Sequence, residues 1–337
     1  MKQILLLLLL FHYMIAACQE KSTEEHLRSV FFSPANYCNA YNAKTPPALR
    51  IRTGDTVHTR SLDALGFDKD SVKRGERGNP LTGPFYIEGA FAGDAIAITI
   101  VDLSLNRNFA TTLNAFIPKI LPNPQARLLW RKAKLVRWNL DLINKTATPA
   151  NNYEHLSGLS IPLDPFLGSV GVAPPGTKSI SSGGFGVWGG NLDFNAIKKS
   201  ATLYLPVYHE GAFLYLGDGH AAQGDGELNG DALETSLDFA FTVTIVKNAG
   251  PRLTYPRVED RDYTMAFGQA KNLDLALKEA TLNLMNWLQQ EYNLSVEEAT
   301  QLIGPAVEYR IPKIASDTVE VVAMIKKNIL DKLKKGL

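Results

Sequence analysis

The sequence has little cysteine: its 337 residues include two, Cys18 and Cys38. Two thiols exclude the multi-disulfide framework that holds many small secreted domains together. Neither cysteine lies within a catalytic motif, which disfavours hydrolases that attack with a cysteine nucleophile. We expect Cys38 to be a small structural thiol.

The sequence also lacks an excess of charge of one sign, a serine-nucleophile motif and a long apolar run. Its 35 basic and 34 acidic residues leave a net charge of +1, which gives no electrostatic basis for binding nucleic acid. No Gly-x-Ser-x-Gly pentapeptide is present, which argues against an α/β-hydrolase. The apolar run Ile4–Phe11 is too short to cross a membrane as a helix.

The N-terminus has the pattern of an export signal. A basic start and the apolar run lead to Ile15-Ala-Ala-Cys18, which looks like a bacterial lipobox. We therefore expect residues 1–17 to be a signal peptide and Cys18 to carry the lipid, although simple cleavage after Ala17 is the alternative. The protein would then be an exported lipoprotein, held on the periplasmic or cell-surface side of a membrane through this anchor alone. Residues 18–47 would form a tether and a connecting loop.

Acidic and glycine residues gather in the segment Leu203–Thr235. Its two apolar runs, Leu203–Tyr208 and Ala212–Leu216, flank a glycine-containing break and predict a hairpin. Asp218, His220, Asp225 and Glu227 then follow within ten residues, spaced by glycines. Clustered carboxylates need compensation by a metal, a shared proton or a bound ligand. A solvated loop with glycine turns is the structural alternative.

Three blocks of the sequence resemble the acetamidase/formamidase family of amide hydrolases. They are NPLTGPFYIEGAFAGD at Asn79–Asp94, GGFGVWGGNLD at Gly183–Asp193 and LGDGHAAQGDGE at Leu216–Glu227, in the family's order. The resemblance runs from about Gly54 into the C-terminal region. It is weakest over Arg107–Asn144 and Thr146–His155, which we expect to shape a different substrate pocket.

Alternation of apolar and polar residues predicts many strands, with two helices late in the chain. The helices are expected at Asn272–Tyr292 and after a Ser295-x-x-Glu298 capping box, with the second one stopped at Gly304-Pro305. Ala126–Leu142 is expected to form strands because of its aromatic and β-branched content. Together these patterns predict a β-dominated α+β protein.

The family resemblance adds detail to this expectation. It implies a jelly-roll-like β-sandwich merged with additional β and α elements, spread over residues 48–337 as one catalytic domain or two intimate subdomains. It also implies hydrolysis of short linear amides such as formamide and acetamide to a carboxylate and ammonia. We expect a small amide as the substrate and a homo-oligomer as the assembly.

Amide hydrolysis needs a nucleophile, stabilisation of the oxyanion and a proton for the leaving nitrogen. Because no serine or cysteine nucleophile is indicated, we expect water activated by carboxylates or by a divalent metal, with zinc as the expected ion. The expected metal ligands are His220, Asp193 and Asp63. The carboxylates expected to act in catalysis are Glu88, Asp193, Glu227 and Asp225. The groups expected to bind the substrate and the oxyanion are Gly189, Gly190 and Asn191.

Structural explanations compete with two of these assignments. Glu88 would equally suit a structural pair with a nearby arginine, and the glycine-rich residues 183–193 would suit a plain turn between strands. Two rival functions also stay open: a non-catalytic ligand- or carbohydrate-binding lipoprotein, and a hydrolase of a larger amide or lactam.

Overall fold

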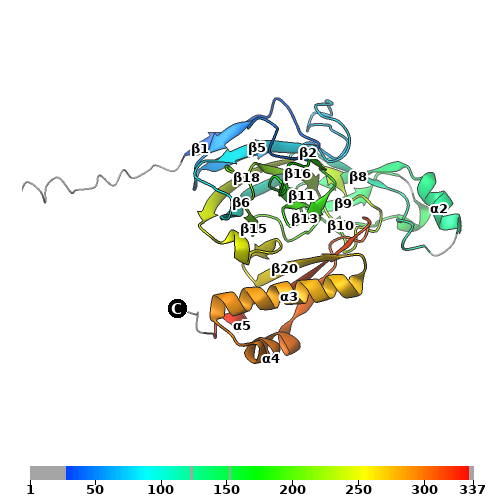
Figure 1. The fold of residues 1–337 in the computed structure, drawn as a ribbon. Coiled ribbons are helices and arrows are strands. Elements are labelled where there is room, and N and C mark those ends of the chain that lie inside the picture. The colour runs from blue at the N-terminus through cyan, green and yellow to red at the C-terminus, as the bar shows by residue number, and fades with distance from the viewer. Residues whose placement is uncertain (1–27, 122–123, 152, 334–337) are drawn as a thin grey trace, which may run out of the picture.

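The protein is built from two large sheets and a helical layer (Figure 1). The structure, a computed structural model, describes residues 28–121, 124–151 and 153–333. Sheets of nine and eleven strands account for most of the fold, which confirms a β-dominated α+β protein. The jelly-roll description stays a prediction.

The expected signal peptide and Cys18 lie outside the described residues, so both remain predictions from the sequence. None of the helices among the described residues combines the length and the hydropathy that a membrane-spanning helix needs.

The helices of the C-terminal region pack onto the nine-stranded sheet. In spatial order its strands are β1 (Ser29–Phe31), β4 (Thr56–Arg60), β18 (Leu237–Val246), β6 (Ala95–Leu105), β15 (Thr202–Pro206), β19 (Arg257–Glu259), β20 (Tyr263–Ala270), β22 (Val319–Lys326) and β21 (Glu308–Arg310). The alternating segments at residues 95–105 and 237–246 form long strands as expected, and they pair along their whole length.

The eleven-stranded sheet contains most of the motif residues. Its main path is β10 (Ile161–Pro162), β9 (Thr146–Pro149), β8 (Leu135–Asp141), β7 (Phe109–Leu113), β17 (Glu234–Thr235), β16 (Leu214–His220), β11 (Phe166–Gly171), β14 (Gly189–Asn191) and β13 (Phe185–Gly186). Off this path, β5 (Leu81–Ile87) pairs with β16 and with β3 (Leu49–Ile51). A separate pair joins β2 (Ala40–Tyr41) to β12 (Ile180–Ser181).

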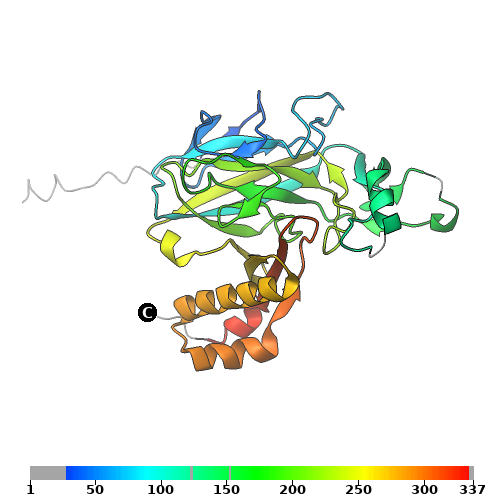
Figure 2. The same ribbon diagram turned by 45° about the vertical axis from the view of Figure 1, so that its right-hand side comes forward.

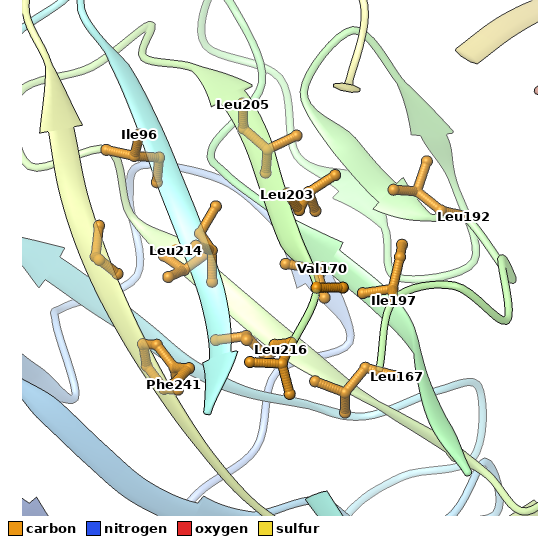
Figure 3. Packing of buried hydrophobic residues seen from close by; sticks show 14 of the residues in the cluster. Ile96, Leu167, Val170, Leu192, Ile197, Leu203, Leu205, Leu214, Leu216 and Phe241 are labelled. Carbon is orange, nitrogen blue, oxygen red and sulfur yellow. The ribbon is translucent and has the colours of Figure 1, made fainter. Parts of the chain in front are cut away.

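The main core lies between the two sheets (Figure 3). Ile96, Leu203 and Leu205 come from the nine-stranded sheet and pack in the same buried cluster as Leu214 and Leu216 of β16. Burial of such aliphatic side chains contributes about 1.5–3 kcal/mol each. The cluster thereby fixes β16, the strand that supplies two of the site residues described below.

Four helices are present in the described residues: α2 (Pro124–Arg131), α3 (Leu273–Tyr292), α4 (Val296–Ala306) and α5 (Lys327–Leu330), with 3-10 turns at Glu154–Leu156 and Gly250–Arg252. Figure 1 and Figure 2 show α3 lying along β20 and α4 on its outer side. Asn272 caps α3, and the capping box of Ser295 and Glu298 is formed at the start of α4. Both predicted helix starts are therefore confirmed.

Three local predictions are wrong, one of them in part. Of the expected strand segment Ala126–Leu142, the residues up to Arg131 lie in helix α2, whose Pro124 stands in the first turn, where a missing N–H costs no hydrogen bond. The later part, Leu135–Asp141, forms strand β8 as expected. Helix α4 continues through Gly304-Pro305 and ends at Ala306. Proline removes one backbone N–H donor, and in the last turn this loss does not end the helix before the proline.

The third error concerns Leu203–Leu216, which do not form a hairpin. Pro206 pairs with Ala95 in one sheet, whereas Leu214 pairs with Phe85 in the other. The segment between them crosses from sheet to sheet, with Ala212 at a left-handed φ of 58°.

Candidate active site

The site is centred on the C-terminal half of β16. Asp218 and His220 lie inside this buried strand, and not in a loop beyond it as expected. His220 pairs across the sheet with Phe166 of β11 on one side and with Glu234 of β17 on the other. Strand pairing thus places the Glu234 carboxylate beside the imidazole.

A glycine on β11 makes room for the polar groups. A Cβ on Gly168 would lie 2.7 Å from Asp193 Oδ1, 2.7 Å from His220 Cε1 and 2.8 Å from Asp218 Oδ2. No side chain fits there, so the three polar groups converge directly over the backbone of Gly168. Asp193 reaches this place from the end of β14, the strand on the far side of β11.

Two groups of possible metal ligands share the imidazole. Asp193, His220 and Glu227 bring one ligand atom each to within 4.8 Å of one another, and so do Asp218, His220 and Glu234. His220 Nε2 lies 3.3 Å from Glu234 Oε1, 3.5 Å from Asp218 Oδ1 and 3.9 Å from Asp193 Oδ1. All five residues are buried.

Three of these carboxylates stand on unusual backbone. Asp193, Asp218 and Glu227 have φ values of 44°, 61° and 49°, in the left-handed region that residues with a Cβ adopt at a cost. Such conformations persist where the surrounding structure imposes them, and they concentrate at functional sites.

Lys313 supplies positive charge from the loop between β21 and β22. Its ammonium contacts Asp193 Oδ2 and lies 3.5 Å from Glu227 Oε2. The fully buried Glu320 of β22 adds a further carboxylate nearby, since its charge helps to raise the pKa of Lys313. Burial opposes the charged lysine, but Asp193 and Glu227 outweigh that effect.

The buried acids outnumber the buried bases, and the pKa values reflect this. Burial raises the pKa of Glu234 to about 7 and raises the pKa values of Asp193, Glu227 and Glu320 above their ordinary range. Burial disfavours the imidazolium of His220, but Glu234 and Asp218 outweigh it and raise its pKa. An excess of buried carboxylate is the arrangement that a bound cation would neutralise.

The residues present fit a metal ion. Within the described part of the chain, five buried atoms of the site make no hydrogen bond: Asp193 Oδ1, Asp218 Oδ1, His220 Nδ1, Glu227 Oε2 and Glu234 Oε2. Unsatisfied buried polar atoms are rare in folded proteins, and each calls for a missing partner. Each of the two ligand groups offers two carboxylate oxygens and an imidazole nitrogen, a donor set suited to a divalent cation.

The glycine-rich segment is ordered in the sheet, and not a flexible loop as expected. Gly189, Gly190 and Asn191 form β14 between β11 and β13, and the Asn191 N–H donates to the Gly184 carbonyl. A Cβ on Gly190 would lie 2.3 Å from that carbonyl oxygen, which explains the glycine. The Asn191 N–H is therefore used within the sheet, while the expected oxyanion role of Gly189 and Gly190 stays a prediction.

Asn191 instead holds carboxylates in place. Its Nδ2 donates to Asp193 Oδ2 at 2.5 Å, while its Oδ1 accepts from Asn79 Nδ2 at 2.8 Å and from Ser169 Oγ at 2.9 Å. Asn79 Nδ2 also donates to Asp218 Oδ2 at 3.0 Å. This network connects the first sequence block to the second and third.

Two other expected site residues are engaged elsewhere. Asp63 forms a buried ion pair with Arg107 at 2.9 Å and accepts the N–H of Phe67, so it belongs to neither ligand group. Glu88 is half exposed and lies 3.4 Å from Arg52. Because β5 runs antiparallel to β16, with Leu81 beside Gly217, Glu88 lies at the opposite end from His220, about 30 Å along the strand.

Asp225 lies at the edge of the site. Arg310 grips both of its carboxylate oxygens, with Nε 2.8 Å from Oδ2 and Nη2 2.7 Å from Oδ1. The pair is partly exposed, and Asp225 is in neither ligand group. Its carboxylate is therefore committed to a surface ion pair.

Several site residues were not predicted. Asp218 lies inside the third sequence block and was noted among its clustered acids, but no ligand role was assigned to it, and Glu234 follows seven residues after the end of that block. Lys313 and Glu320 carried no local signal, because the pairing of β22 with β20 and β21 brings their segment to the site from far along the chain.

A cavity of 460 Å³ adjoins the site. Glu227 is the member of the two ligand groups that lines it, together with the neighbouring Gln223. Phe116, Trp138 and Leu233 contribute apolar walls. The first two come from the segment in which the family resemblance is weakest.

A family model, a solved structure and a curated enzyme link this chain to acetamidases and formamidases. A model of the Acetamidase/Formamidase family matches residues 186–331, a range that includes the site residues from Asp193 to Glu320. The crystal structure of acetamidase from Bacillus halodurans has a TM-score of 0.76 and 28% identity, covering 90% of this chain and 99% of that one. Formamidase from Methylophilus methylotrophus is 24% identical over 349 residues, 80% of this chain and 82% of its own.

A shorter similarity involves a different enzyme. DNA ligase of Ureaplasma parvum is 26% identical over 141 residues, which is 39% of this chain. The chain spans 20% of the length of that ligase.

Proposed function

The chain belongs to the Acetamidase/Formamidase family of amide hydrolases, and we propose that it hydrolyses the carbon–nitrogen bond of short linear amides such as formamide and acetamide. The products would be ammonia and a carboxylate. The observation that carries the proposal is the convergence of four buried carboxylates on His220, at a place where no side chain fits beneath them. The rival interpretation as a non-catalytic ligand-binding protein gives no reason for buried acids in strained backbone.

Asp218, His220 and Glu234 are the residues proposed to hold a divalent cation, since all three lie on paired strands and their ligand atoms are close together. A cation bound there would supply positive charge that acidifies water and polarises a carbonyl group. Imidazole and carboxylate donors suit zinc and other first-row divalent ions, so zinc is the first ion to test.

Glu227 is the proposed proton carrier. It lines the cavity, and burial raises its pKa above the ordinary range of a carboxylate, which suits a group that takes up and returns a proton. As the oxygen of water bonds to the amide carbon, the carboxylate of Glu227 would take the water proton. It would return that proton to the nitrogen as the carbon–nitrogen bond breaks, so the enzyme ends unchanged.

Asp193 and Lys313 are proposed to position this carrier. Lys313 contacts Asp193 and lies 3.5 Å from Glu227, so its charge holds the two carboxylates close together. Asn191 fixes Asp193 from the other side. The export of the protein, its lipid anchor at Cys18 and its assembly as a homo-oligomer remain proposals from the sequence alone.

The test is ammonia release by the purified protein from formamide and acetamide. We expect turnover that a chelator abolishes and that added Zn²⁺ or another divalent ion restores. Absence of ammonia from every amide, with metal present, would refute the proposed function. Full activity in the metal-depleted protein would refute the metal assignment alone.

A further inference from the structure

The cavity beside Glu227 is too large for the smallest amides. Its volume is 460 Å³, whereas acetamide fills roughly 100 Å³, the share of three to four water molecules. Cavities that bind drug-sized ligands span about 300–1,000 Å³. A bound acetamide would leave most of this space to water.

The walls of the cavity are suited to an apolar ligand. Phe116, Trp138 and Ile161 line it, together with Leu228 and Leu233 from the segment between Glu227 and β17. Aromatic and aliphatic walls with a few placed polar groups are typical of binding sites for organic molecules. Water held against such walls is readily displaced by apolar groups.

The charged residues that line the cavity further restrict the kind of ligand that it can bind. None of the described residues that line the cavity is a lysine or an arginine, whereas Asp164, Asp225 and Asp231 are among them. Lys198 pairs with Asp164 and Arg310 with Asp225, so two of these acids are already balanced. No described side chain of the lining would attract a carboxylate or a phosphate group of a ligand.

Resting on the proposed function, we propose that the substrates are primary amides of larger, uncharged carboxylic acids, with an acyl group of medium chain length or with an aryl ring. The carboxamide lies at Glu227, and the acyl group lies along Phe116, Trp138 and Leu233. Gln223 is placed to receive the amide nitrogen: its Nε2 donates to the carbonyls of Asp193 and Pro312, while its buried Oε1 makes no hydrogen bond.

The first experiment compares kcat/KM for ammonia release from acetamide, butanamide, hexanamide and phenylacetamide. Each methylene group that becomes buried strengthens binding roughly fourfold. We therefore expect kcat/KM for hexanamide to exceed kcat/KM for acetamide by about two orders of magnitude. A flat series, or a decline from acetamide onward, would overturn the inference.

Two variants test whether this cavity is responsible. Ala222→Leu adds a branched side chain to the cavity wall, and Trp138→Ala removes an apolar wall. Each should lower the ratio of kcat/KM for hexanamide to kcat/KM for acetamide by about tenfold or more. Equal losses on both substrates in the variant that retains its fold by circular dichroism would place the acyl group elsewhere.

Calorimetric binding of the same series separates the two proposals. Binding that strengthens with chain length without ammonia release would keep the cavity assignment and refute the amidase function. Ammonia release from formamide and acetamide, with no binding of the longer amides, would keep the function and refute the larger substrate.

Discussion

His220 is the residue on which the metal assignment depends, because it belongs to both groups of ligands. We expect His220→Ala to lower bound metal and ammonia release by at least about a hundredfold. Metal analysis of the purified variant and an ammonia assay would measure the two losses together. A variant that is metal-replete and active would remove His220 from the site.

The matched control is Glu88→Gln, a change to the acid that the structure places away from the site. Glu88 is half exposed and paired with Arg52, and such surface pairs contribute about 0–1 kcal/mol. We expect kcat/KM and metal content within about twofold of the unaltered protein. A large loss of activity would restore Glu88 to the catalytic assignment.

Single residues were predictable where chemistry and motif coincide. His220, Asp193 and Glu227 were named from the sequence, and the structure brings them together. Asp63 and Glu88 were also named, but each satisfies an arginine instead. Nothing in a local stretch of sequence states which charged partner a carboxylate will meet, since Arg107 and Arg52 approach through strand pairing.

Among the elements, the contact of α3 with β20 is the tightest. A Cβ on Gly268 of β20 would lie 2.1 Å from the Ala280 nitrogen and 2.4 Å from the Ala276 oxygen, both in the backbone of α3. Gly268→Ala must therefore push the helix away from the sheet. We expect a loss at the upper end of about 1–3 kcal/mol in the free energy of unfolding, measured by urea denaturation.

Gly304→Ala provides the matched control for this prediction. Gly304 lies in α4 with nothing near its would-be Cβ. Alanine there should change the free energy of unfolding by less than about 1 kcal/mol, because its restriction of the unfolded chain is offset by the clash of its Cβ with the ring of Pro305. A clearly larger loss for Gly268→Ala would show that packing, not composition, sets the effect. Similar small effects of both changes would refute the close contact.

Elements were predictable where one periodicity dominates. The strand at residues 237–246 and the helix at residues 273–292 follow from clear alternation and from a helical stripe. The supposed hairpin at Leu203–Leu216 failed because its two runs belong to different sheets. Apolar runs predict that strands exist, but they do not predict which strands pair. The partners here, Ala95 for Pro206 and Phe85 for Leu214, lie far away in the sequence.

At the scale of the whole molecule, the C-terminal region completes the site. The nine-stranded sheet runs on into β20, β22 and β21, against which α3 packs. The loop between β21 and β22 carries Lys313 to Asp193, and β22 itself carries Glu320. Truncation of this region would leave the buried acids without their lysine. The family match, which ends at residue 331, includes both residues.

The excess of buried acid predicts how stability depends on metal and pH. In the metal-free protein the pKa of Glu234 is raised to about 7 from an ordinary value of 4.5. The stability that such a group contributes is fully present when the pH is below its pKa in the unfolded chain. This stability is lost as the pH rises through the folded-state pKa of about 7. The raised pKa of His220 acts in the same direction. Metal-free protein should therefore lose stability between pH 6 and pH 8.

Bound metal should reverse this loss, because the ion binds the deprotonated carboxylates and the neutral imidazole. Binding only to the folded state adds about 2.7 kcal/mol at a free metal concentration one hundred times Kd. We expect the difference in Tm between metal-loaded and chelator-treated protein to be larger at pH 8 than at pH 6, measured by differential scanning calorimetry. Glu234→Gln should reduce that pH dependence, because it removes one of the titrating ligands. A difference that is absent at both pH values, or that shrinks as pH rises, would mean that these acids do not hold the ion.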